Sequence, residues 1–181
     1  MEASAAKATV ISLGGSVMTT DAGIDTDFLQ TFRDVIVSRI PERRFFIITG
    51  GGSTARIYQY GLAEITDPTD EELDWMGIHS TRLNGQLLRL VFSGHAHDEV
   101  VLTPEAAKTA SAPVVVGAAG STTGRSTDYA SLAIADAVGA DHLIELSDVS
   151  HIYSADPDTN PHAEPYEQLS WREYRDITPD E

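Results

Sequence analysis

The chain has 181 residues, a length that suits one domain of ordinary size. Apolar residues make up 41% of the sequence and charged residues 22%, which allows a hydrophobic core and argues against intrinsic disorder. Twelve basic residues stand against 28 acidic ones, and the formal net charge of −16 disfavours binding to nucleic acid or anionic membranes. So acidic a surface is also compatible with a salt-rich cytoplasm, because dissolved ions screen the mutual repulsion.

Several classes of protein are excluded by what the sequence lacks. It has no cysteine, so it forms neither disulfides nor thiolate metal sites. The polar start of the chain does not resemble a signal peptide, and the apolar runs are far shorter than the roughly 20 residues of a membrane span. His95 and His97 lie close together without neighbouring ligands, so we expect no metal site made by the protein itself. We therefore expect a soluble, cytoplasmic protein.

Short β-branched runs alternate with helical patterns from the beginning of the chain. A strand is predicted over residues 8–13, and it ends at Gly14. Residues 24–40 carry one apolar stripe at helical spacing, with Asp25 or Thr26 as the N-cap. The almost continuous apolar run 45–49 predicts a strand buried on both faces, which ends at three glycines before a second helix opens at Ser53.

The second half of the chain continues this alternation. A long helix is predicted within 73–91, short strands over 100–102 and 112–116, and a loop over 117–127. A helix over 128–138, ended by Gly139, leads to a strand over 142–146; a further helix begins near Trp171. This order of elements predicts an α/β fold, a three-layer α/β/α sandwich around a mainly parallel central sheet.

Three loops rich in glycine or hydroxyl groups follow predicted strands, over residues 14–16, 50–53 and 117–127. In open α/β sheets, ligands bind at the carboxyl ends of the strands, where glycine lets the backbone approach a phosphate group closely. Free N–H groups at the start of a following helix add to such a site. Neither the dinucleotide-binding fingerprint nor the P-loop motif is present, which disfavours a Rossmann dehydrogenase and a P-loop kinase.

Five segments in sequence order resemble the amino-acid kinase family, and within it the UMP kinases of the archaeal type. They are VISLGGSV at 10–17, TGGGSTAR at 49–56, LDWMGI at 73–78 with TRLN at 81–84, GRSTD at 124–128, and YSADP at 153–157. The resemblance implies transfer of the ATP γ-phosphoryl group to UMP with Mg²⁺ held chiefly by phosphate oxygens, and a homohexameric assembly. It also implies a single domain over 1–181 that lacks its C-terminal part, because the family normally continues further.

The resemblance assigns roles to individual residues. Gly15, Ser16 and Asp128 take the catalytic positions, and the N–H groups of Gly14, Gly15 and Ser16 would donate to the ATP phosphates. The remaining ATP-binding positions are Gly52, Arg56, Ser147, Tyr153 and Asp156. The UMP-binding positions are Gly51, Asp74, Gly120, Ser121, Thr122, Thr123, Gly124, Arg125, Ser126 and Thr127.

Two positions depart from the family pattern. Ser12 stands where many relatives have a lysine, and Ser150-His151 replaces an Asp-Gly pair on the ATP side. These changes leave open a non-catalytic protein that binds phosphate, another oxyanion or a nucleotide on the same fold, and also a kinase of another small phosphate acceptor. At single positions, Asp74 and Asp128 have the alternative role of helix caps, and Arg56 that of a surface residue.

Overall fold

The structure is a computed structural model that describes residues 7–20, 22–120, 122–155, 157 and 159–177. The chain divides into two compact units, one over Met1–Ser147 and a smaller one over Asp148–Glu181. The larger unit contains the main sheet. The expectation of a single domain stays a prediction.

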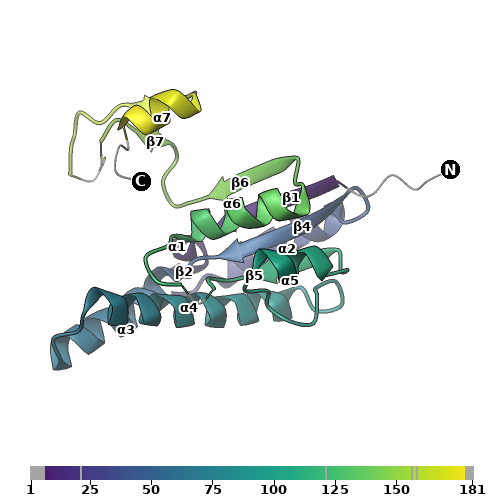
Figure 1. Ribbon diagram of the computed structural model, residues 1–181, viewed down its shortest axis with the longest axis horizontal. Helices are drawn as coiled ribbons and strands as arrows, with labels where there is room; N and C mark the ends of the chain where they lie inside the picture. Colours follow the sequence, from purple (N-terminus) through teal and green to yellow (C-terminus); the bar gives the residue numbers. More distant parts are fainter. Residues whose placement is uncertain (1–6, 21, 121, 156, 158, 178–181) are drawn as a thin grey trace. The chain divides into compact units, whose positions relative to one another are not determined.

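A parallel sheet of four strands is the centre of the larger unit. It is formed by β1 (Lys7–Leu13), β4 (Arg43–Thr49), β5 (Val114–Gly117) and β6 (His142–Leu146), in the spatial order β5-β4-β1-β6 (Figure 1). Each neighbouring pair is parallel, and Ser12 lies opposite Ile48 on one side and Glu145 on the other. All four carboxyl ends therefore meet at one edge of the sheet, as the sequence predicts.

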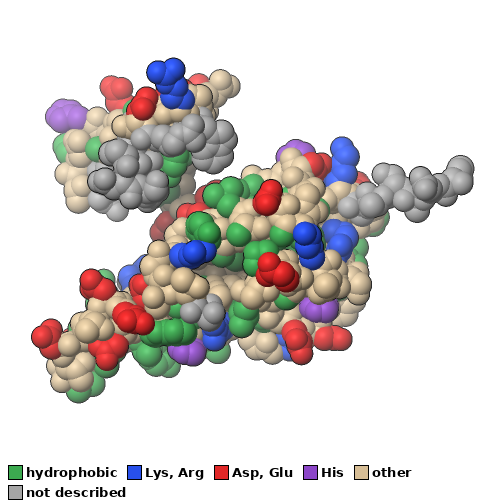
Figure 2. All heavy atoms as spheres, in the orientation of Figure 1, with side chains coloured by type: hydrophobic (Ala, Val, Ile, Leu, Met, Phe, Trp, Pro, Cys, Tyr) green, Lys and Arg blue, Asp and Glu red, His purple; other side chains and the backbone are tan. Residues whose placement is uncertain are grey.

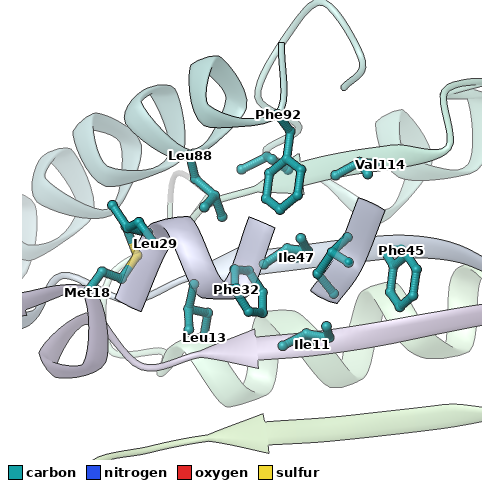
Figure 3. Packing of buried hydrophobic residues seen from close by; sticks show 12 residues of the cluster. Ile11, Leu13, Met18, Leu29, Phe32, Phe45, Ile47, Leu88, Phe92 and Val114 are labelled. Atoms are coloured by element: carbon teal, nitrogen blue, oxygen red, sulfur yellow. The ribbon is translucent and has the colours of Figure 1, made fainter. Parts of the chain in front are cut away.

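Helices cover both faces of this sheet. On one face, α2 (Thr26–Arg39) and α4 (Asp70–Val91) pack with the short α1 (Gly15–Met18) against Ile11, Leu13 and Ile47. Figure 3 shows side chains from these helices converging on the strands. On the other face, α5 (Pro104–Thr109) and α6 (Thr127–Val138) pack against a second set of strand residues that includes Val10. The predicted three-layer α/β/α sandwich is confirmed.

Smaller elements complete the two units. β2 (Thr19–Thr20) pairs with β3 (Gly23–Ile24), and α3 (Gly52–Ile65) packs along α4. The smaller unit contains β7 (Ile152–Tyr153), β8 (Pro165–Tyr166) and α7 (Trp171–Ile177). No helix in the described part of the chain has both the length and the apolar character needed to cross a membrane.

Several helices and strands begin or end at other residues than the sequence predicts, for local reasons. Helix α4 begins at Asp70 because Thr69 and Glu72 form a capping box, so Asp74 is not its cap. The cap of α6 is Ser126, whose hydroxyl accepts the Tyr129 N–H, so the alternative of Asp128 as the cap is also wrong. Residues 100–102 form no regular strand, and Val101 makes only an isolated bridge to Gly117.

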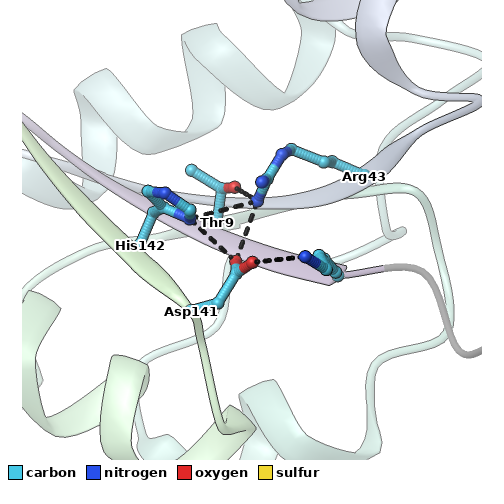
Figure 4. Close-up of polar contacts among 5 residues, drawn as sticks. Thr9, Arg43, Asp141 and His142 are labelled. Carbon is cyan, nitrogen blue, oxygen red and sulfur yellow. Dashed lines mark hydrogen bonds and ion pairs between the residues drawn. The ribbon is translucent and has the colours of Figure 1, made fainter.

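A polar cluster ties the amino ends of the strands together, at the edge opposite the loops (Figure 4). One guanidinium nitrogen of Arg43 donates to Thr9 Oγ1 and to Asp141 Oδ1, each at 2.8 Å. Hydrogen bonds from His142 and then from Arg43 lower the pKa of Asp141 to about 2. The cluster stabilises strand pairing and lies far along the sheet from the phosphate-binding candidates.

Candidate active site

Four loops gather at the carboxyl edge of the sheet. Gly14 follows β1, Gly50 follows β4, Ala118 follows β5 and Ser147 follows β6. The first three are the loops that the sequence predicts as phosphate-binding. Because the strands are parallel and in register, residues from four distant parts of the chain lie together here.

The first two glycine loops pack directly on each other through their backbones. A Cβ atom added at Gly15 would lie 2.1 Å from the backbone nitrogen of Gly52. Gly52 itself has φ of +56°, and a Cβ there would lie 2.3 Å from the carbonyl carbon of Gly15. Glycine is therefore required at both positions by contact between the loops, whatever they bind.

The N–H of Gly14 is already used by the protein. It donates to the carbonyl oxygen of Leu146 at 2.8 Å, which fastens the first glycine loop to the end of β6. A Cβ on Gly14 would lie 2.9 Å from the same oxygen. This N–H therefore already has an acceptor within the protein, contrary to the expectation that it donates to an ATP phosphate, and Gly14 instead allows close approach of β6.

The Thr81–Asn84 segment of α4 supports two of the loops from behind. Asn84 is 2% exposed, and its amide nitrogen donates to the carbonyl oxygens of Gly50 at 2.8 Å and Gly51 at 3.0 Å. Thr81 Oγ1 accepts the N–H of Ala119 at 3.1 Å, and the Arg82 guanidinium donates to the carbonyl oxygens that follow β5. This segment acts as a scaffold, a role that its sequence alone does not reveal.

A pocket of about 300 Å³ opens between α3, α4 and the loop that precedes α6. That volume is at the lower end of the range for small-molecule sites. The pocket brings together ten of the residues predicted to bind nucleotides: Gly51, Gly52, Arg56, Asp74, Thr122, Thr123, Gly124, Arg125, Ser126 and Thr127.

Charged groups of both signs line this pocket. Arg56 donates to Ser53 Oγ at 3.0 Å, and Asp74 Oδ2 accepts the Gly124 N–H at 2.6 Å. The second contact holds the loop against α4, so Asp74 orders the pocket wall. The guanidinium of Arg125 lies 4.3 Å from the centre of the Tyr129 ring. Two guanidinium groups, a carboxylate and several hydroxyl groups are thus arranged around one space.

Other predicted site residues lie outside this pocket lining. Gly120 accepts a hydrogen bond from Arg82 through its carbonyl oxygen, and Ser147 comes close to Gly14 at the end of β6. Tyr153 belongs to the smaller unit, where its hydroxyl lies 3.0 Å from Ser150 Oγ. Ser121 and Asp156 fall outside the described residues.

The Ser150-His151 pair takes part in the same contacts of the smaller unit. His151 Nδ1 lies 3.0 Å from Ser150 Oγ, and its ring packs edge-on against Tyr153 with 6.2 Å between centres. The pair that replaces Asp-Gly therefore contacts Tyr153, a residue predicted to hold the adenosine end of ATP.

Asp128 lies in a polar cluster that sequence reasoning missed in part. Ser12 is 1% exposed, and its hydroxyl donates to Asp128 Oδ1 at 2.8 Å. Glu145 faces both from β6. Although the Glu145 residue is exposed overall, burial of its carboxyl raises its pKa to about 7; the negative charge of Asp128 adds to this shift and the Ser12 hydroxyl opposes it.

Within the residues that the structure describes, no group of three or more His, Cys, Asp or Glu side chains is placed to hold a metal ion.

Glu145 could have been found only from the register of β1 and β6, because nothing in its own sequence neighbourhood distinguishes it.

Comparison with known proteins agrees with this geometry. Residues 7–180 match the model of the amino acid kinase family. The chain is 36% identical over 169 residues to the uridylate kinase of Methanospirillum hungatei, covering 93% of this chain and 70% of that protein. It is 34% identical over 180 residues to the uridylate kinase of Haloarcula marismortui, covering 94% and 75%.

Solved structures of uridylate and UMP kinases resemble this chain as well. The uridylate kinase of Archaeoglobus fulgidus superposes with a TM-score of 0.79 at 31% identity, covering 94% of this chain and 77% of that one. The UMP kinase of Bacillus anthracis, at 20% identity and a TM-score of 0.74, shares the fold. On these matches, this chain belongs to the amino acid kinase family.

Proposed function

We propose that this chain is an ATP-dependent UMP kinase, which transfers the γ-phosphoryl group of ATP to a phosphate oxygen of UMP to give ADP and UDP. The observation that carries the proposal is the pocket that Arg56 and Asp74 share with the loop over 122–127, directly beside the paired glycine loops. The relatives described above, which are named uridylate kinases, support the choice of acceptor.

UMP would occupy the pocket between α3 and α4. The Asp74 carboxylate would accept hydrogen bonds from the ribose hydroxyls. Its Oδ2 accepts the N–H of Gly124, and a carboxylate has further acceptor sites on both oxygens. The backbone of Gly51 and the hydroxyls of Thr122, Ser126 and Thr127 line the same space. Gly120, Ser121, Thr123 and Arg125 would complete the wall around the nucleotide.

ATP would lie on the side of the first glycine loop. Gly15 and Ser16 would contact the transferring phosphoryl group, with Gly14 shaping the loop and Gly52 facing it. Ser147, Tyr153 and Asp156 would hold the adenosine end. Arg56 and Asp74 line the same pocket. The Arg56 guanidinium is therefore suited to the region where the phosphates of ATP would meet the phosphate of UMP.

The chemistry demands little covalent work from the protein. The accepting phosphate oxygen is already anionic, so no strong base is required, and alignment with charge neutralisation supplies the rate enhancement. When bound, Mg²⁺ would neutralise the negative charge of the phosphate chains and would be held chiefly by their oxygens. ATP and UMP are substrates that the enzyme would meet in the cytoplasm.

The proposal includes assembly of identical chains into a hexamer. Large apolar side chains remain exposed along the α3–α4 hairpin, and their burial between chains would stabilise an assembly. They are Ile57, Tyr58, Tyr60, Ile65, Leu83 and Leu90. Light scattering after size exclusion would measure the assembly directly, and a monomer at micromolar concentration would contradict this part of the proposal.

The activity is tested by coupled measurement of ADP release with Mg²⁺, ATP and UMP, and with CMP, AMP and small phosphorylated acceptors as alternatives. We expect turnover to require UMP. Asp74→Asn should raise the KM for UMP about tenfold or more and leave the KM for ATP nearly unchanged, because it weakens a hydrogen bond to a charged group. The matched control is Asp70→Asn, an exposed carboxylate on the same helix.

The outcomes separate the alternatives. Turnover of another acceptor in the absence of UMP turnover would overturn the substrate assignment. Calorimetric binding of nucleotide with no turnover of any acceptor would favour the non-catalytic binding protein.

A further inference from the structure

A buried hydroxyl group joins the first two glycine loops. Thr19 directly follows α1 and is 2% exposed. Its Oγ1 donates to the carbonyl oxygen of Gly15 at 2.8 Å and accepts the N–H of Ser53 at 3.0 Å. Gly15 belongs to the loop after β1 and Ser53 to the first turn of α3, so one hydroxyl spans the contact between the loops. Thr19 lies outside all five segments that resemble the family.

The backbone around Thr19 fixes the position of this hydroxyl. The N–H of Thr19 also donates to the carbonyl oxygen of Gly15, as the C-cap of α1. Thr19 pairs with Ile24 in the β2–β3 hairpin, and the N–H of Asp25 donates to the carbonyl oxygen of Met18 at 2.9 Å. The chain on both sides of Thr19 thus holds its side chain between the two loops.

The same network reaches the nucleotide pocket through Ser53. The Ser53 residue is 3% exposed, and its hydroxyl accepts a hydrogen bond from the Arg56 guanidinium at 3.0 Å. Arg56 lines the pocket together with Asp74. Thr19 therefore contacts both the loop proposed to bind ATP and the first turn of the helix whose guanidinium is proposed to meet the phosphates.

We propose that Thr19 is a positioning residue for phosphoryl transfer: its hydroxyl sets the distance between the two glycine loops, and thereby the alignment of the donor phosphoryl group with the acceptor phosphate. The proposal rests on the proposed function, because it takes these loops as the sites of the two phosphates. Transfer between bound groups depends steeply on alignment, and a misplacement of about 1 Å can cost about 100-fold in rate. Binding of either nucleotide alone depends much less on the spacing of the loops.

Thr19→Val tests this role, because it removes the hydroxyl and keeps the branched shape of the side chain. A methyl group needs roughly 3.5 Å to a neighbouring heavy atom, against 2.8 and 3.0 Å in the present contacts. The loops would therefore move apart by about half an ångström. We expect kcat for UMP phosphorylation to fall about tenfold or more, with nearly unchanged KM values for ATP and UMP. Thr19→Ser retains the hydroxyl and should keep kcat close to that of the wild type.

Thr9→Val provides the matched control at the amino edge of the sheet. Thr9 is also 2% exposed, and its Oγ1 accepts a hydrogen bond from Arg43 at 2.8 Å. Both valine variants lose one buried hydroxyl and should have lower melting temperatures, but only Thr19→Val should lose kcat when all rates are measured well below those temperatures. Equal losses of kcat in the two valine variants, or in Thr19→Ser and Thr19→Val, would overturn the proposal.

Calorimetry with a bisubstrate ligand, in which a pentaphosphate chain joins adenosine to uridine, measures the loop spacing without turnover. This ligand must reach both loops at once, whereas ADP and UMP each occupy one side of the site. Thr19→Val should raise the Kd of the bisubstrate ligand about tenfold, because binding at both sites at once depends on their geometry. The Kd values of ADP and UMP should stay nearly unchanged.

The two measurements separate this inference from the proposed function. If the wild type does not phosphorylate UMP but the bisubstrate ligand shows the expected difference, the proposed reaction fails and the inference stands. If UMP is phosphorylated and Thr19→Val retains the wild-type kcat, the inference fails and the proposed reaction stands. Absence of both the turnover and the difference in binding would overturn both.

Discussion

The amide of Asn84 is almost fully buried and donates to two consecutive carbonyl groups of the second glycine loop. It illustrates how a residue can shape a nucleotide site without being expected to touch the nucleotide. Asn84→Ala leaves both carbonyl oxygens without this donor, and we expect a loss of about 1–3 kcal/mol in the free energy of unfolding. The KM values for both substrates should rise, because the loop lies between the two proposed nucleotide sites.

Urea unfolding and steady-state kinetics measure these two effects. The control is Gln86→Ala, an exposed amide on the same helix, which should change neither quantity appreciably. A variant that lost stability but kept both KM values would show that the loop holds its shape without Asn84.

Asp141, at the amino edge of the sheet, should make the stability of the fold depend on pH. Its pKa is lowered from 3.8 to about 2 by His142 and Arg43, so the native state holds its carboxylate more strongly than the unfolded chain does. The resulting stability is present above about pH 4 and is lost as the pH falls toward 2. Thermal unfolding between pH 2 and pH 5 should therefore show a shallower slope for Asp141→Asn, and identical slopes would contradict the assignment.

At the scale of elements, the contact between the two glycine loops sets the geometry of the site. Gly15→Ala would place a methyl group against the backbone of Gly52, where no side chain can move aside. We expect a loss of about 3 kcal/mol or more in the free energy of unfolding, together with loss of ATP binding. Differential scanning calorimetry and nucleotide titration provide the two measurements.

Gly61 provides the matched comparison for this substitution. It lies within α3, and a Cβ there would meet nothing within 4 Å. Gly61→Ala should stabilise the protein by about 0.5–1 kcal/mol, since alanine loses less backbone entropy in a helix. Equal responses of the two glycines would show that the loop contact is not tight.

The sequence predicts most of the elements here because their signals are local. Alternating strands and helices, the N-cap at Asp25 and the left-handed Gly139 are all visible within a few neighbouring residues. The two caps at Thr69 and Ser126 are also local signals. Asp74 and Asp128 are alternative cap candidates in the sequence, because aspartate is also a preferred N-cap residue.

The unpredicted parts of the site depend on contacts between distant segments. Asn84 donates to Gly50 and Gly51, which lie 34 and 33 positions earlier in the sequence. Ser12 and Asp128, which are hydrogen-bonded, lie 116 positions apart. The pairing of Ser12 with Glu145 follows from strand order, which no local pattern encodes. The resemblance identified the pocket residues because it carries three-dimensional information that the residue types do not.

At the scale of the whole molecule, the formal charge of −16 opposes compaction. Acidic side chains gather at the tip of the α3–α4 hairpin, where Glu64, Asp67, Asp70, Glu71 and Glu72 follow one another closely (Figure 2). Raising the NaCl concentration from 10 mM to 1 M shortens the Debye length from about 30 Å to about 3 Å. We expect the melting temperature to rise by several degrees.

The same salt series near pH 5 serves as the control, because the sequence pI is about 4.5 and the net charge there is small. The response should be weaker at that pH. A melting temperature that is the same at low and high salt at neutral pH would mean that the acidic surface exerts no net repulsion.

The position of β6 next to β1 has a consequence for how the protein is made. Thr9 of β1 pairs with His142 of β6, and β1 is one of the two inner strands of the sheet. One edge of β1 therefore has no partner until the ribosome has synthesised β6. At roughly 5–20 residues per second, that interval is on the order of ten seconds. Until then the backbone groups along that edge remain open to other strands. Leu146, which fastens the first glycine loop, arrives with the same strand, so the loop acquires its final anchor only when translation has passed it.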